Sequence, residues 1–105
     1  MTVRVYHVRP ERFAAAVRGE TFPLDEYIPV ADVATHVLGT AYMRTNHIDS
    51  DWTTGSGVVL LEPIYGQPTK GPANHRSTSV GDLMEHDGHF YRVAPVGFEP
   101  YRSPS

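Results

Sequence analysis

The sequence predicts a single small α+β domain, in which an antiparallel or mixed, curled sheet packs with two to three short helices. Three observations lead to this class. The chain of 105 residues has the length of one domain. Strand-like segments occur near both ends, and segments with helical periodicity lie between them. Nine Gly and nine Pro residues punctuate the chain, which favours short elements joined by turns.

The first strand and the first helix are expected within the N-terminal part of the domain, residues 1–46. Residues 2–8 alternate and are rich in β-branched side chains, which is typical of a strand. Pro10 suits the first turn of a helix, because its missing N–H is not needed there, and Gly19 supplies the stop. These residues predict a strand followed by a short helix.

A second helix and a second strand are predicted next. Residues 20–29 mix prolines with apolar side chains and predict an irregular segment pinned onto the core. Residues 30–38 have the apolar stripe of an amphipathic helix, formed by Val30, Val33, Ala34, Val37 and Leu38. Residues 40–46 alternate again, which predicts a strand. The N-terminal part is thus expected to run strand, helix, helix, strand.

The middle of the chain is less regular. Residues 47–57 hold two acids, two glycines and the only Trp, which predicts an irregular loop. Residues 58–65 are ambiguous by period, because β-branched side chains favour a strand whereas Pro63 excludes a central one. The residues alone leave strand and helix open for this segment.

The clearest local signal is Asp87-Gly88 between two segments of apolar and aromatic residues. A type I′ turn needs positive φ at both central positions, and Asp-Gly tolerates it, so the pair predicts a β-hairpin. A two-residue loop fixes the facing residues, which are His86 with His89, Glu85 with Phe90, Met84 with Tyr91, and Leu83 with Arg92. Apolar side chains then fall on both faces, which predicts a hairpin covered on both sides or curled into a barrel-like sheet.

A longer pattern surrounds this hairpin, and it consists of Arg76-Ser77-Thr78-Ser79-Val80-Gly81-Asp82, Tyr91 and Gly97-Phe98. The pattern resembles the C-terminal half of the YodL-like domains, small bacterial domains found alone and in phage, plasmid and other mobile-element proteins. The resemblance covers residues 58–101. It implies a short helix over residues 58–65, and a mobile-element factor that modulates a host process or counters a defence system. We expect residues 102–105 to form a frayed tail.

Composition and charge exclude several functional classes. A net charge of -3 and a pI near 6.0 argue against general affinity for nucleic acid, which depends on clustered Lys and Arg. The absence of Cys removes disulfides, cysteine-zinc sites and thiol catalysis. No stretch approaches the roughly 20 apolar residues of a membrane span, and the N-terminus has no signal-peptide pattern. We therefore expect a cytoplasmic protein without a membrane segment, and no cofactor.

Histidine is the first candidate for chemistry, because the chain has six of them. His86 and His89 would lie close across the hairpin, and Glu85, Asp87 or His75 could complete a metal site. A hairpin with His at both shoulders is more often a solvated turn, so we assign no metal ligands. A metal-dependent hydrolase or nuclease that uses His86 and His89 stays as the alternative function.

Serine catalysis is the second candidate. Ser77 or Ser79 could act as a nucleophile with His75 or His86 as base and Asp82 as the orienting acid. The sequence around these serines lacks the strained elbow of a G-x-S-x-G nucleophile. Ser, Thr and Asp ahead of a strand more often bond turn backbone groups, so a structural role is favoured.

Arginine and tyrosine give the favoured prediction, because both are enriched at interfaces. The candidate partner-binding residues are Arg44, Arg76, Tyr91, Arg92 and Tyr101. We expect a small, non-enzymatic domain that binds a macromolecule, in the first place an unidentified host protein, as a monomer or a homodimer. An RNA or DNA module that uses the same side chains is a further alternative. Arg76 is either an exposed contact or an internal partner of Asp82.

Overall fold

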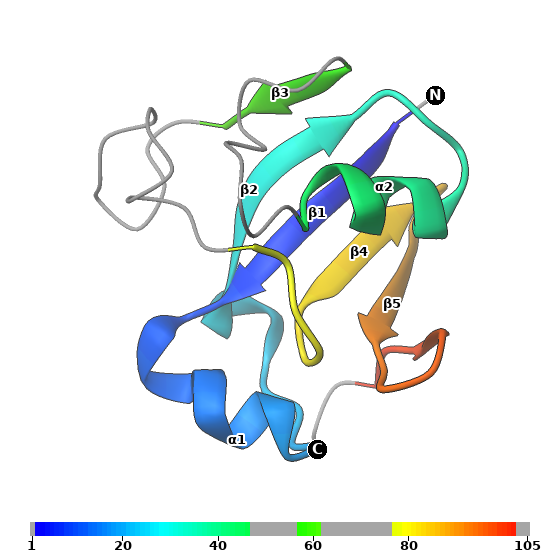
Figure 1. Ribbon diagram of the computed structural model, residues 1–105. Helices are drawn as coiled ribbons and strands as arrows, with labels where there is room; N and C mark the ends of the chain where they lie inside the picture. Colours follow the sequence, from blue (N-terminus) through cyan, green and yellow to red (C-terminus); the bar gives the residue numbers. More distant parts are fainter. Residues whose placement is uncertain (1, 47–56, 62–76, 103–105) are drawn as a thin grey trace.

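The computed structural model describes residues 2–46, 57–61 and 77–102. Within them the chain forms one antiparallel sheet of six strands in the order β3-β2-β1-β4-β5-β6, together with two α-helices (Figure 1). The elements are β1 (Val3–Val8), η1 (Pro10–Arg12), α1 (Phe13–Val17), η2 (Leu24–Glu26), β2 (Tyr27–Val33), α2 (Leu38–Arg44), β3 (Val58–Leu60), β4 (Leu83–His86), β5 (His89–Val93) and β6 (Phe98–Pro100). The predicted α+β class is confirmed.

The two helices pack on opposite faces of the sheet. The core on the α2 face consists of Val3, Val5, Val30, Ala31, Val33, Ala41, Met84 and Val93. The core on the α1 face consists of Val8, Ala16, Tyr27 and Leu83. The neighbours Leu83 and Met84 belong to different cores, so the hairpin is covered on both sides, as predicted.

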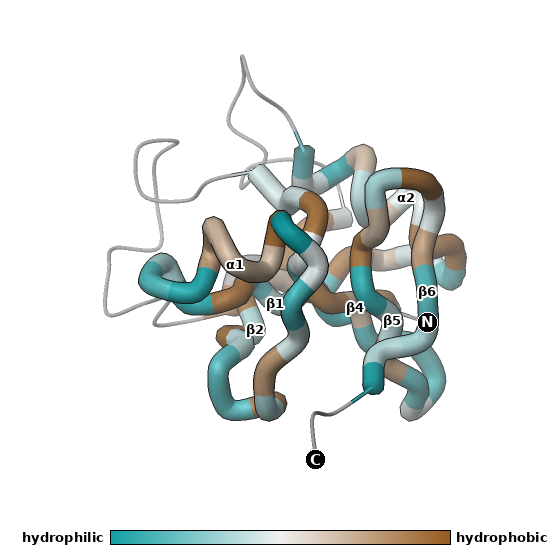
Figure 2. Tube along the Cα trace, turned by 90° about the horizontal axis from the view of Figure 1, so that it is seen from below, coloured by the Kyte–Doolittle hydropathy of each residue, from teal (hydrophilic) through white to brown (hydrophobic). Residues whose placement is uncertain are grey.

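Apolar and polar stretches alternate over short distances along the chain (Figure 2). No helix in the described ranges is long and apolar enough to cross a membrane. The predicted first strand is confirmed as β1, in which Val3, Val5 and His7 are buried on the α2 side. The helix predicted after Pro10 is confirmed as η1 and α1.

The helix predicted over residues 30–38 is wrong, because β2 runs through Val33. The register between β1 and β2 shifts at Val30, which is the extra residue of a β-bulge. Val30, Ala31 and Val33 are all buried as a result. The bulge interrupts the two-residue period of the strand, and the remaining spacing imitates the stripe of an amphipathic helix.

The strand predicted over residues 40–46 is also wrong, because α2 occupies Leu38–Arg44. The side chains that this helix and its C-cap turn inward follow helical spacing, and they are Leu38, Ala41, Tyr42 and Thr45. Gly39 lies inside this helix with open space around it. Packing of the inward stripe against the sheet outweighs the weak helix propensity of Gly and Thr.

The helix expected over residues 58–65 is wrong where the structure describes the segment, because Val58–Leu60 form strand β3. Val58 faces Val33 and Val59 faces Asp32 across an antiparallel pair. Two β-branched residues in a row favour this extended form. Residues 62–65 and most of the expected loop 47–57 lie outside the described residues.

The hairpin is confirmed residue by residue. His86 faces His89, and the three further facing pairs of β4 and β5 are those predicted from a two-residue loop. Asp87 has φ 56° and Gly88 has φ 81°, the positive values that a type I′ turn requires. Gly97, with φ 73°, then turns the chain from β5 into β6.

Candidate functional site

Residues 77–82 connect the two halves of the fold through the buried carboxylate of Asp82. Its Oδ1 accepts the backbone N–H of Val8 at 3.0 Å, and its Oδ2 accepts that of Ser79 at 2.8 Å. The Asp82 side chain is fully buried. Hydrogen bonds to a charged acceptor are stronger than neutral ones, so Asp82 fixes residues 77–82 against β1.

His7 lies next to this carboxylate in the interior. Its Nε2 is 3.0 Å from Thr78 Oγ1 and 4.0 Å from Asp82 Oδ2, and all three residues have no exposed surface. A Ser-His-Asp hydrolase places the nucleophile and the acid on different ring nitrogens, in reach of substrate. Here the same nitrogen approaches both groups in a sealed interior. We assign the cluster a structural role.

This geometry also bears on the predicted serine chemistry. Asp82 lies beside His7 of β1, whereas His86 is at the tip of the hairpin, at the other end of β4. The Asp82 carboxylate accepts the backbone N–H of Ser79, so Asp82 has the turn role that the sequence favours for Ser, Thr and Asp in this stretch. His75 and Arg76 lie outside the described residues, so the predicted pair of Arg76 with Asp82 stays a prediction.

Thr78 joins the same segment to the end of α2. Its N–H donates to the Thr45 carbonyl at 2.8 Å, and its own carbonyl accepts Asn46 Nδ2. Asn46 Nδ2 also lies 3.0 Å from the Tyr42 hydroxyl. Residues 77–82 therefore bond both to the end of α2 and to β1.

On the opposite face the same stretch packs against α1. Gly81 has φ 98°, and a Cβ at this position would lie 2.8 Å from the backbone of Ala16. Arg92 is buried, and its guanidinium donates to the Ala16 carbonyl at 3.0 Å and to Glu99 at 3.1 Å. Arg92 thus links α1 to β6 inside the fold.

The four predicted partner-binding residues that the structure describes do not form one patch. Arg44 is exposed at the end of α2, and Tyr91 is half-buried on β5. Arg92 is interior. Tyr101 donates its hydroxyl to the Phe22 carbonyl at 2.5 Å, and its ring packs edge-on against Tyr27. Arg76 lies outside the described residues. Arg92 and Tyr101 are therefore committed to internal contacts.

The hairpin tip is solvated. His86 Nδ1 is 3.3 Å from the Thr2 carbonyl, and His89 is exposed. Glu85 accepts the Tyr6 hydroxyl at 2.7 Å, on the sheet face opposite to His86. Among the described residues, no three His, Asp or Glu side chains gather as a metal site would require. The hairpin places the two histidines opposite each other but adds no third ligand within this part of the chain.

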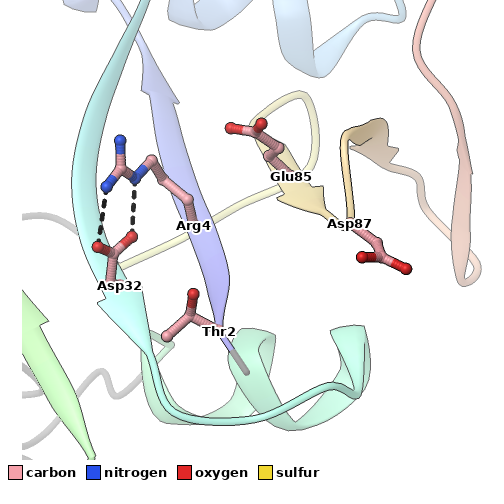
Figure 3. A pocket seen from close by; sticks show the side chains of 5 residues that line it. All are labelled: Thr2, Arg4, Asp32, Glu85 and Asp87. Carbon is pink, nitrogen blue, oxygen red and sulfur yellow. Dashed lines mark hydrogen bonds and ion pairs between the residues drawn. The ribbon is translucent and has the colours of Figure 1, made fainter.

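A shallow polar depression lies beside β1, lined by Thr2, Arg4, Asp32, Glu85 and Asp87. Arg4 and Asp32 form a two-bond fork at 2.8 and 3.0 Å, while the Asp87 carboxylate points away from them (Figure 3). Burial, followed by the hydrogen bond to Glu85, raises the pKa of Tyr6 to about 12. Arg4 is paired with Asp32, whereas Glu85 bonds the neutral Tyr6 hydroxyl and Asp87 adds a third carboxylate, so the lining carries more negative than positive charge.

A different surface is apolar and carries no charge. A groove of about 230 Å³ lies between α2 and the turn that joins β5 to β6. Its lining residues are Gly39, Tyr42, Val80, Val93, Ala94, Pro95, Gly97 and Phe98. The rings of Tyr42 and Phe98 meet edge to face at 6.3 Å. We call this surface the α2 groove.

Two exposed apolar side chains border the α2 groove. Met43 is 70% exposed and follows Gly39 by one helical turn, so it lies along the same helix surface. Val96 is 92% exposed and lies between Pro95 and Gly97, which both line the groove. The sequence does not predict this surface, because its walls come from three separate segments, α2, residues 77–82 and the β5–β6 turn.

Comparison with known proteins finds no matching family model, no similar curated protein and no similar solved structure. The resemblance to YodL-like domains therefore stays a prediction.

Proposed function

We propose that this protein is a non-enzymatic cytoplasmic domain that binds another protein through the α2 groove. The observation that carries the proposal is an uncharged groove with two exposed apolar side chains, Met43 and Val96, at its rim. The segment of the partner that enters the groove is apolar and uncharged, because no residue that lines the groove could pair with a charged side chain.

Exposure of the rim supports a binding role. Val96 contributes almost no buried area to the fold, and Met43 contributes little. Apolar area that stays in water gives no folding stability, whereas covering it on association is favourable at about 25 cal/mol per Å². Methionine also adapts its shape to different partners, and it is common on protein-binding surfaces.

The wall of the groove is preformed, which lowers the entropy lost on binding. Tyr42 is fixed at its hydroxyl by Asn46 and at its ring by Phe98. Val80 belongs to residues 77–82, which the Asp82 carboxylate holds. The segment that resembles YodL-like domains thus supplies one wall, and the resemblance adds the proposal that the protein is a phage, plasmid or other mobile-element factor acting on a host protein.

The experiment compares three forms: the wild-type protein, Met43→Lys, and Val59→Lys as a matched control. Val59 is 61% exposed on β3 and faces Asp32, so its lysine is accommodated away from the groove. Each form is immobilised and exposed to cytoplasmic extract of the organism that carries the gene. The enriched protein is then purified, and its Kd for each form is measured by calorimetry.

We expect Met43→Lys to weaken binding at least tenfold, because an ammonium group must lose water in an apolar contact. Val59→Lys should change the Kd less than about twofold. Equal affinity for all three forms would contradict the proposal. Self-association that Met43→Lys abolishes, seen by light scattering, would instead make the occupant a second copy of this chain. About one equivalent of bound zinc without any partner would favour the hydrolase alternative at His86 and His89.

A further inference from the structure

Strand β6, which contributes Phe98 to the α2 groove, presents a backbone donor and a backbone acceptor at the edge of the sheet. Ala94 N–H donates to the Gly97 carbonyl and Tyr101 N–H donates to the Phe90 carbonyl, both at 3.0 Å. Residues 97, 99 and 101 therefore turn their backbone groups toward β5, because bonding direction alternates along an antiparallel strand. Phe98 lies between them, so its N–H and C=O point away from β5.

In the described part of the chain, β6 is the last strand on this side of the sheet, and no group bonds to the backbone of Phe98. The side chain of the same residue lines the α2 groove. One residue thus combines two unused hydrogen-bonding groups with an apolar wall. A second strand laid along β6 would bond to the N–H and C=O of Phe98. One of its side chains would then pack against the Phe98 ring in the α2 groove.

Pro100 limits how far such pairing can extend. It lies two residues beyond Phe98, on the same outward side of the ladder, and it has no N–H to donate. The edge of β6 therefore offers the N–H of Phe98 as its one outward donor. For the same reason, β6 strands of two copies of this chain cannot pair with each other over a long stretch. A short segment fits this edge, and a long strand does not.

We propose that the α2 groove takes a short extended segment of the partner, which bonds through its backbone to the N–H and C=O of Phe98. An uncharged apolar side chain of that segment packs against Tyr42 and Phe98. A helical ligand fits less well, because its backbone groups are already bonded within the helix. This inference rests on the function proposed above and specifies the conformation of the occupant.

The test selects peptides from a phage-displayed library of random linear 12-residue sequences on the wild-type protein. Peptides that still bind Val59→Lys but no longer bind Met43→Lys are synthesised. Hydrogen exchange at the Phe98 amide is followed with and without each peptide, and every peptide nitrogen is methylated in turn. N-methylation removes a donor and blocks strand pairing without changing the side chains.

We expect selected peptides to carry an uncharged apolar residue and to slow exchange of the Phe98 amide at least tenfold. N-methylation at one position should weaken binding about tenfold, as for one backbone hydrogen bond. Peptides that need Met43 but leave Phe98 exchange unchanged would overturn strand pairing and leave the proposed function standing. If selection yields no peptide that distinguishes Met43→Lys from Val59→Lys, both proposals fall.

Discussion

The α1 face and the α2 face of the sheet differ in how their packing is closed off from solvent. On the α1 face, polar groups close the packing: Arg92 binds the Ala16 carbonyl, and Tyr101 binds the Phe22 carbonyl. On the α2 face, apolar walls leave an open groove with Met43 and Val96 at its rim. Arg92 and Tyr101 therefore stabilise the fold, whereas the exposed side chains of Met43 and Val96 can contact a partner in the proposed complex.

The largest expected effect tests the link between the two faces. Asp82→Ala leaves the buried N–H of Val8 and the partly buried N–H of Ser79 without their acceptor, which should lower the free energy of unfolding by about 3–5 kcal/mol. Urea unfolding measures this loss. Asp82→Asn keeps an acceptor oxygen and should lose roughly half as much. A loss under about 1 kcal/mol for Asp82→Ala would show that the carboxylate does not hold residues 77–82.

The next effect tests the tight packing of the α1 face. Gly81→Ala combines a strained positive φ with a Cβ 2.8 Å from the Ala16 backbone, so we expect a loss of about 2–4 kcal/mol. Gly88→Ala is the matched control, since Gly88 has φ 81° but open space around it. Its loss should stay near 1 kcal/mol, from strain alone. Equal losses at both positions would mean that the contact with α1 contributes nothing.

A smaller effect concerns pH. The pKa of Tyr6 is raised from 10.0 to about 12, first by burial and then by its hydrogen bond to Glu85. The unfolded chain therefore releases this proton at lower pH than the folded chain does. The stabilisation is fully present below pH 10 and is lost as pH rises toward 12. Stability of Tyr6→Phe, measured over the same range, should fall less steeply, and parallel curves would refute the shift.

The smallest expected effect is on stability at the groove rim. Met43→Lys and Val96→Lys should change the free energy of unfolding by less than about 0.5 kcal/mol, because both side chains are already in water. Thermal unfolding checks this directly. A larger loss would place these residues in the core and remove the contrast between the two faces.

Local signals in the sequence predicted local structure well. Asp87-Gly88 defined the hairpin and all four facing pairs, because turn chemistry alone determines them. The bulge at Val30 arises only when β2 meets β1, so no pattern within residues 30–38 could reveal it. The wrong helix over residues 30–38 follows from that bulge, whereas the wrong strand over residues 40–46 follows from the packing of α2 against the sheet.

Which side chains stay free to bind a partner is harder to predict from the sequence than the fold. Arginine and tyrosine were expected on the surface, but Arg92 and Tyr101 satisfy internal carbonyls whose positions depend on tertiary packing. Val80 and Phe98, by contrast, belong to the pattern singled out from sequence and line the α2 groove. The opposite wall comes from α2, some 40 residues earlier in the chain, and spacing along a sequence carries no such distance.

The proposed binding surface is the α2 groove. Backbone amide spectra of the labelled protein, recorded while a selected peptide is added, test it most directly. We expect the largest shifts at Gly39, Tyr42, Gly97 and Phe98, with little change around Phe22 on the α1 face. Shifts centred on the α1 face, or on the hairpin tip, would contradict the account and place the binding surface elsewhere.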